Sequence, residues 1–227
     1  MNNNGGASWR ASKQAPPNDE HRQTMKAVAT RRALVVLAHP VPESFVAAAA
    51  DRLIDALQHA GYLVDTIDLY AEEFDPVLRV DEYRQLRSNA KATTSTGTTN
   101  PHAEKLRDCD TLALVYPTWF GAQPAILKGW FDRVWIEGVA YRLRRFRRQP
   151  LLRNIRTLLV VTSHGSPKIV NAITGEAGKR VVGRGLRSMC HPRCRVRWLA
   201  FYGNDRCTAA DRERFLDRVT AVADRLG

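Results

Sequence analysis

The sequence lacks several features that would place the protein in other classes. It contains no apolar run close to the ~20 residues that span a bilayer, and its first 25 residues lack the apolar core of a signal peptide. Only 4 cysteines occur among the 227 residues, and they do not form the dense pairs of a disulfide framework. We therefore expect a cytoplasmic protein with no membrane insertion.

Motifs for other kinds of site are also missing. The loop that follows the first apolar run carries neither a G-x-G-x-x-G fingerprint nor a P-loop, which disfavours a Rossmann-type nucleotide site. The chain has no G-x-S-x-G elbow that would indicate a serine hydrolase. Cys190, His191 and Cys194 are close together, but no second pair of ligands lies nearby, so we expect no metal site.

The charge that is present is strongly positive. The formal net charge is +12, and seven arginines lie between residues 142 and 156. Such a run indicates either a patch that binds polyanions or a solvated face. No aromatic stacking platform or groove-reading motif accompanies it, so the solvated face is favoured and we expect no nucleic-acid partner. Positive potential near an active site would attract anionic nucleotides.

Strands and helices alternate five times along the chain. The run 34–38 is apolar throughout, as in a strand buried on both faces, and Ser44 can cap the helix that follows. Five alternations with right-handed crossovers favour an α/β fold: a flavodoxin-like three-layer sandwich around a five-stranded parallel sheet in the order 2-1-3-4-5. The strands are expected at residues 34–38, 63–69, 112–116, 157–162 and 196–202.

Two segments fall outside this alternation. Residues 1–30 are polar and carry adjacent prolines, so we expect a disordered N-terminal extension before a single domain over 31–227. Between residues 74 and 100 the alternation of strands and helices is interrupted, with a short helix expected at 81–88 and an exposed loop at 92–100.

Three loops are expected to meet at one edge of the sheet. Ligands of open parallel sheets bind at the carboxyl ends of the strands, where the strand order reverses. For this order the reversal lies between the first and third strands. The loops there are 39–45, which meets a helix N-terminus suited to phosphate, 117–121, which carries two aromatic residues, and 162–167, which is polar. Plain roles as a helix cap, a hydrophobic plug and a connecting loop remain open for them.

Two segments of the chain resemble the NAD(P)H:quinone oxidoreductase family of flavodoxin-like flavoproteins. They are residues 38–45 and residues 116–134, which read YPTWFGAQPAILKGWFDRV. His164 departs from the family, which has a small residue there, and Val46 stands where members often carry asparagine. The resemblance implies that eleven residues hold a flavin: His39, Ser44 and Phe45 at its phosphate, Pro117, Thr118, Trp119 and Phe120 at its ring, and Thr162, Ser163, His164 and Gly165 in a third loop.

The resemblance implies an activity as well. It indicates ping-pong, two-electron transfer of hydride from NAD(P)H to a quinone-like acceptor, with FAD more strongly indicated than FMN because the connection 74–100 is long. The alternatives are an ancillary regulatory flavoprotein of a potassium efflux system and a one-electron carrier, and the +12 charge disfavours the carrier. No catalytic side chain is assigned.

The resemblance also implies a homodimer. Trp130 and Trp135 lie on one expected helix but are too far apart around it to share one narrow apolar stripe. We therefore expect one of the two to be buried against a second subunit.

Overall fold

A computed structural model describes residues 31–89, 100–145 and 147–226. The expected disordered extension over residues 1–30 and most of the expected loop 92–100 lie outside the described residues. None of the helices in these three ranges combines the length and the apolar character that a membrane-spanning helix needs.

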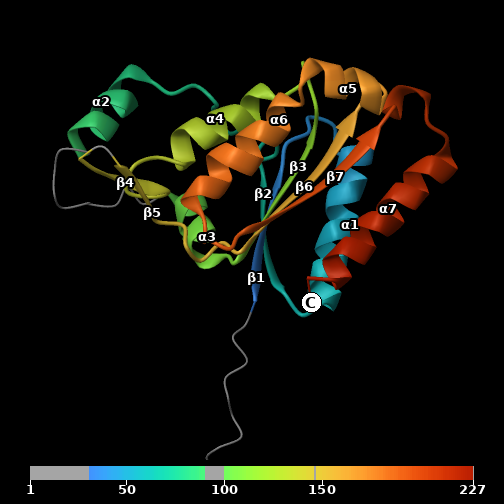
Figure 1. Ribbon diagram of the computed structural model, residues 1–227, viewed down its shortest axis with the longest axis horizontal. Coiled ribbons are helices and arrows are strands. Elements are labelled where there is room, and N and C mark those ends of the chain that lie inside the picture. The colour runs from blue at the N-terminus through green and yellow to red at the C-terminus, as the bar shows by residue number, and fades with distance from the viewer. Residues whose placement is uncertain (1–30, 90–99, 146, 227) are drawn as a thin grey trace, which may run out of the picture.

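A five-stranded parallel sheet forms the centre of the molecule (Figure 1). Its strand order, β2-β1-β3-β6-β7, is the predicted order 2-1-3-4-5, so the predicted fold class is confirmed. Alternate residues of each strand face opposite sides, as in β1, where Leu34 and Val36 join one apolar cluster and Ala33 and Val35 join the other. The strands are β1 (Arg32–Leu37), β2 (Leu63–Asp68), β3 (Thr111–Pro117), β6 (Thr157–His164) and β7 (Arg195–Tyr202).

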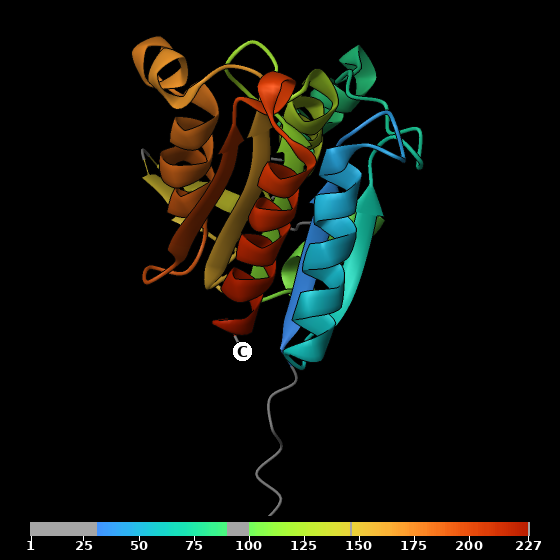
Figure 2. The same ribbon diagram turned by 90° about the vertical axis from the view of Figure 1, so that its right-hand side faces the viewer.

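Helices cover both faces of this sheet. One face packs against α1 (Phe45–His59) and α7 (Ala209–Asp224), which lie side by side in Figure 2. The cap expected from the sequence is present, since Ser44 caps α1. Thr208 and Asp211 form a capping box at the start of α7. The opposite face packs against α3 (Pro101–Asp108), α4 (Ala125–Val134), η2 (Val181–Gly185) and η3 (Leu186–Met189), with α6 (Ala177–Arg180) leading into η2.

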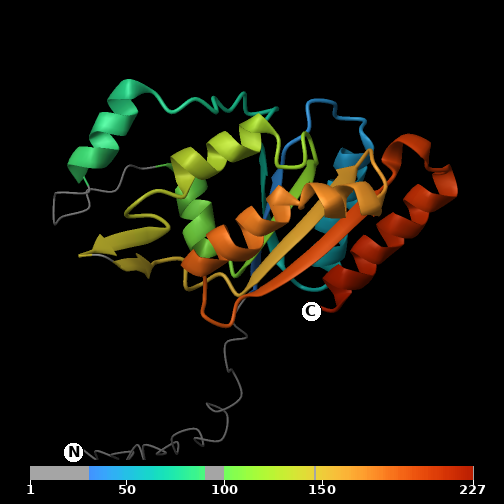
Figure 3. The same cartoon turned by 45° about the horizontal axis from the view of Figure 1, so that its top comes forward.

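Two elements were not expected from the sequence. Helix α3 begins after Asn100, whose side chain accepts a hydrogen bond from the His102 amide, and Pro101 occupies its first turn. The arginine-rich segment forms a hairpin of β4 (Tyr141–Arg144) and β5 (Arg147–Pro150), which projects from the side of the sandwich (Figures 1 and 3). The remaining elements are α2 (Val80–Asn89), α5 (Lys168–Thr174) and η4 (Asn204–Arg206).

The two tryptophans of α4 are both buried within this chain. Trp130 is 0% exposed and donates a hydrogen bond from Nε1 to Nδ1 of His102, and Trp135 is 8% exposed. The expectation that one of them is buried against a second subunit is therefore wrong. The helix lies between the sheet and the segment before α2, where Gly129 meets Pro76, so it buries more than one stripe. A homodimer itself stays a prediction.

Gly129 of α4 marks a close approach of two backbones. A Cβ atom there would overlap the backbone of Pro76, whereas a Cβ on Gly185 would meet nothing within 4 Å. We expect Gly129→Ala to lower the free energy of unfolding by about 1–3 kcal/mol, the usual cost of overpacking. Gly185→Ala, the matched control, is expected to leave it unchanged or slightly higher. Urea denaturation of both variants measures this, and equal stability of the two would contradict the described packing.

Candidate functional site

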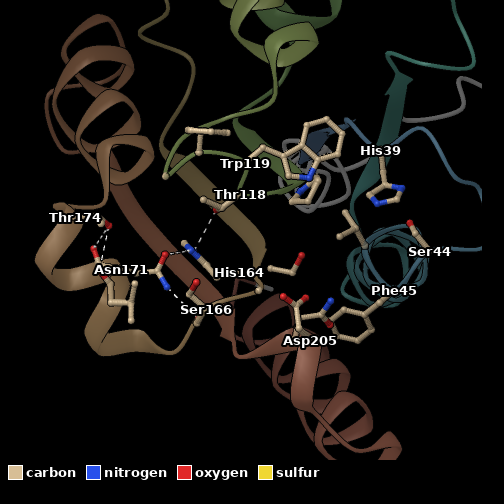
Figure 4. A pocket seen from close by; sticks show the side chains of 18 of the residues that line it. His39, Ser44, Phe45, Thr118, Trp119, His164, Ser166, Asn171, Thr174 and Asp205 are labelled. Carbon is tan, nitrogen blue, oxygen red and sulfur yellow. Dashed lines mark hydrogen bonds between the residues drawn. The ribbon is translucent and has the colours of Figure 1, made fainter.

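A cavity of about 910 Å³ opens at the carboxyl ends of the sheet strands. Its volume is within the range of about 300–1,000 Å³ that is common for small-molecule and cofactor sites. Figure 4 shows His39, Ser44 and Phe45 on one side of the cavity and Asn171 and Thr174 on the other. The cavity therefore lies where the strand order reverses, which is the position predicted for the site from the sequence.

The three expected loops meet in this cavity. Of the eleven residues predicted to hold a cofactor, all but Thr162 line it. Thr162 lies behind the lining, and its hydroxyl is 2.9 Å from that of Thr118. The ten lining residues are His39, Ser44, Phe45, Pro117, Thr118, Trp119, Phe120, Ser163, His164 and Gly165.

The α1 side of the cavity favours a negatively charged group. Phe45 and Val46 are the first residues of a 15-residue helix, so their amide groups have no partner within the helix. They lie at the positive end of the helix dipole. Nδ1 of His39 lies 3.0 Å from the amide nitrogen and 3.1 Å from the carbonyl oxygen of Val41, which fixes the imidazole against its own loop. The guanidinium of Arg212 lies 6.0 Å from the Phe45 ring centroid.

The loop after β3 presents two aromatic side chains at the mouth of the cavity. Trp119 is 44% exposed and Phe120 is fully exposed. The amide groups of Trp119 and Ala122 each donate to the carbonyl of the other at 3.1 Å, which closes a tight turn. Phe120 and Gly121 take positive φ values of 50° and 74° inside this turn. The turn thus holds an apolar surface suited to a planar ring.

The side chain of His164 is almost fully buried at the wall of the cavity, beneath the third loop. It is 4% exposed, and its ring stacks on that of Tyr202 with centroids 4.6 Å apart. Tyr202 donates a hydrogen bond to Glu176. Burial and this bond raise the pKa of Tyr202 to about 12, so it stays a neutral donor. The larger side chain at position 164 therefore leaves the backbone of the loop open to the cavity.

Hydrogen bonds fix the tautomer of His164. Both N–H groups of the Asn171 amide donate to backbone carbonyls, those of Ser166 at 3.1 Å and Pro167 at 3.0 Å. The Asn171 oxygen therefore accepts from Nδ1 of His164, 2.8 Å away, and Nε2 is left to accept from the Thr118 hydroxyl at 3.3 Å. This neutral imidazole connects the loop after β3 to α5.

The buried imidazole makes stability depend on pH. Desolvation lowers the pKa of His164, against the opposing effects of the Asn171 hydrogen bond and the Glu176 charge. Below the ordinary histidine pKa of about 6.5 the unfolded chain binds more protons than the folded protein, so the free energy of unfolding decreases as the pH falls below about 6.5. We expect the melting temperature of His164→Asn to fall less than that of the wild type when the pH is lowered from about 7 to about 5. An equal or greater loss would show that His164 is not held neutral.

The matches to known proteins agree with this geometry. The model of the family described as flavodoxin-like fold matches residues 31–218. The chain belongs to this flavodoxin-like family. It is 34% identical over 152 residues to NAD(P)H dehydrogenase (quinone) 1 of Cavia porcellus, covering 61% of this chain and 55% of that protein. It thus spans little more than half the length of that relative.

Solved structures show the same relationship. An NAD(P)H:quinone oxidoreductase from Methanothermobacter marburgensis has a TM-score of 0.69 at 27% identity, covering 87% of this chain and 98% of that one. An FMN-dependent NADH-azoreductase from Bacillus anthracis, solved with FMN, also has a TM-score of 0.69, at 13% identity and with 87% and 99% coverage. The latter likeness shows the fold alone. The predicted relationship of this flavodoxin-like protein to quinone oxidoreductases is confirmed.

Several lining residues were missed from the sequence. Asn204 and Asp205 follow β7, whose carboxyl end lies at the same sheet edge, so the strand order alone was sufficient to indicate them. Asp205 packs against Gly165, where a Cβ atom would overlap its carboxylate. Asn171 and Arg212 carried no sequence signal, because their positions depend on how α5 and the first turn of α7 lie near the loops.

The cysteine and histidine group near residue 190 lies apart from the cavity. Cys190 and Cys194 are buried thiols in the segment before β7, away from the carboxyl edge of the sheet. Among the residues that the structure describes, no three histidine, cysteine or acidic side chains come together as metal ligands.

Proposed function

We propose that the cavity binds a flavin and that the protein passes hydride from NAD(P)H to a quinone-like acceptor in two half-reactions. One observation carries this proposal: groups suited to a phosphate, on the α1 side, share a cavity with the exposed aromatic loop after β3. The quinone oxidoreductase relatives support it, although the chain covers only part of their length.

The residues present fit a flavin. The amides of Phe45 and Val46, Nε2 of His39 and the guanidinium of Arg212 would hold its phosphate. Trp119 would cover one part of the ring system and exclude water from it. When bound, the flavin supplies the hydride-accepting and hydride-donating chemistry, while the protein supplies position and electrostatics. No side chain of this chain needs to act as an acid or a base in the first half-reaction.

We propose FMN rather than FAD, which reverses the expectation from the sequence. None of the described residues between β2 and β3 lines the cavity, so the long connection that favoured FAD offers no site for an adenosine group there. The azoreductase with the same fold was solved with FMN. A cytoplasmic homodimer remains part of the proposal.

Anaerobic titration of the reconstituted protein tests this function. NADPH or NADH is expected to bleach the visible absorbance of the bound flavin, and a soluble quinone is expected to restore it without NAD(P)H present. Parallel lines in double-reciprocal plots of initial velocity, measured at several quinone concentrations, would support the ping-pong order. A protein that holds flavin but is reduced by neither nucleotide would refute the enzyme and favour the ancillary regulatory role.

A further inference from the structure

The positive charge of the protein is concentrated in one part of the chain. Residues 138–204 contain 15 lysines and arginines and a single acidic residue, Glu176. The remaining positions contain 20 lysines and arginines against 22 aspartates and glutamates. Arginine is thus balanced by carboxylates everywhere else, and the excess belongs to this segment rather than to the composition of the whole protein.

Much of this charge lies on one continuous region. The hairpin β4–β5 leads into residues 151–156. Backbone hydrogen bonds join these to His191, which donates to Ile155 at 3.0 Å, and to Arg195 at the start of β7, which donates to Arg156 at 2.9 Å. Figures 1 and 3 show the hairpin projecting from the body of the molecule. We call this region the basic surface, and we define it by seven exposed arginines: Arg142, Arg144, Arg147, Arg148, Arg153, Arg156 and Arg193.

The seven arginines have no acidic partners among the described residues. None of them forms an ion pair within the described ranges of the chain. Arg144 and Arg147 face each other directly across the hairpin, where like charges destabilise the pairing. Desolvation and the charges of Arg156, Arg193 and Arg153 lower the pKa of His191, which agrees with their grouping around one imidazole. An anionic partner would relieve this repulsion.

We propose that the basic surface docks the protein on an anionic phospholipid bilayer. Leu143 lies between Arg142 and Arg144 in the hairpin and is 50% exposed. Guanidinium groups that bind headgroup phosphates, next to an aliphatic side chain that reaches the acyl boundary, are typical of interfacial binding. The cavity opens at the carboxyl edge of the sheet, whereas Arg153, Arg156 and Arg193 precede strands β6 and β7. This docking therefore does not depend on the proposed flavin site.

The same side chains fit a nucleic acid less well. Binding to single strands depends on exposed aromatic rings on which bases stack. Among the described aromatic residues of the segment, Arg148 lies over the ring of Tyr141 at 5.4 Å, and Trp198 packs against the core. Among the hairpin residues that the structure describes, the exposed apolar side chain is that of Leu143, which is aliphatic.

Vesicle co-sedimentation of the full chain tests this proposal. We expect binding to vesicles of mixed phosphatidylcholine and phosphatidylglycerol, no binding to phosphatidylcholine alone, and weakening of the binding as salt is raised. The variant R142Q/R144Q/R147Q/R148Q is expected to bind the mixed vesicles at least about 100-fold more weakly. R153Q/R156Q/R193Q provides a second test at the other end of the surface should the hairpin variant fail to fold.

The matched control removes four charges from the opposite side of the sheet. R52Q/R214Q/R218Q/R225Q lowers the net charge equally but changes only α1, α7 and the residue after α7, and it is expected to bind the vesicles within about threefold of the wild type, since distant charges are screened. Equal loss in this control would show that net charge alone drives the binding and would overturn the proposal. So would equal binding to phosphatidylcholine alone, or tighter binding to duplex DNA or RNA than to the mixed vesicles.

Discussion

Trp119→Ala is expected to raise the dissociation constant of the flavin by about 10- to 100-fold. The indole is partly exposed at the mouth of the cavity and is held there by the turn between Trp119 and Ala122. Stacking of a planar heterocycle on an aromatic side chain contributes about 1–3 kcal/mol, which corresponds to this change. Because the lost contact is with the ring, riboflavin and FMN should be weakened equally. Quenching of flavin fluorescence on binding measures both constants.

The control for this variant is Trp198→Ala. Trp198 lies in β7 and packs against the core instead of lining the cavity. Its loss is expected to lower stability while leaving the flavin affinity of the folded protein within a few-fold of the wild type. If both variants lose flavin equally at matched stability, Trp119 is only a structural residue.

Arg212→Ala is expected to weaken FMN by at least tenfold and to leave riboflavin unchanged. Arg212 lies above Phe45 at the start of α1, where the free amide groups also favour an anion. A hydrogen bond to a charged group contributes about 1.5–3 kcal/mol, and riboflavin has no phosphate to accept it. The difference between the two ligands separates this contact from general damage to the fold.

Arg214→Ala is the matched control for that variant. Arg214 lies half a turn further along α7 and pairs with Asp211 on the exposed surface. Surface pairs contribute little, so FMN binding should be unchanged. An equal loss of FMN affinity in both variants would show that Arg212 acts through the overall charge of α7 and not at a phosphate.

The sheet could be predicted from the sequence because its strands carry strong local signals. The apolar run around Val35 requires burial on both faces, which only a sheet covered by helices provides. Ser44 and Thr208 cap their helices by hydrogen bonds to residues three positions away, so those starts are encoded locally. Once the strand order was set, the meeting of the three loops at one edge followed from topology.

Other features depend on contacts that local patterns do not encode. The hairpin β4–β5 alternates apolar and polar residues only over the four residues of β4, and its ends are attached to the core at Tyr141 and Leu152. Trp130 looked too large for one helix stripe, but its Nε1 meets His102 on the unexpected α3. Asn171 orients His164 only because α5 folds back over the third loop.

Reconstitution with flavin tests the central claim most directly. The purified, folded chain is mixed with FMN, FAD or riboflavin, separated from free ligand, and the retained flavin is released and identified. We predict stoichiometric retention of FMN, with riboflavin held less tightly because it lacks the phosphate. A well-folded sample that retains neither FMN nor FAD would contradict the assignment of the cavity as a flavin site.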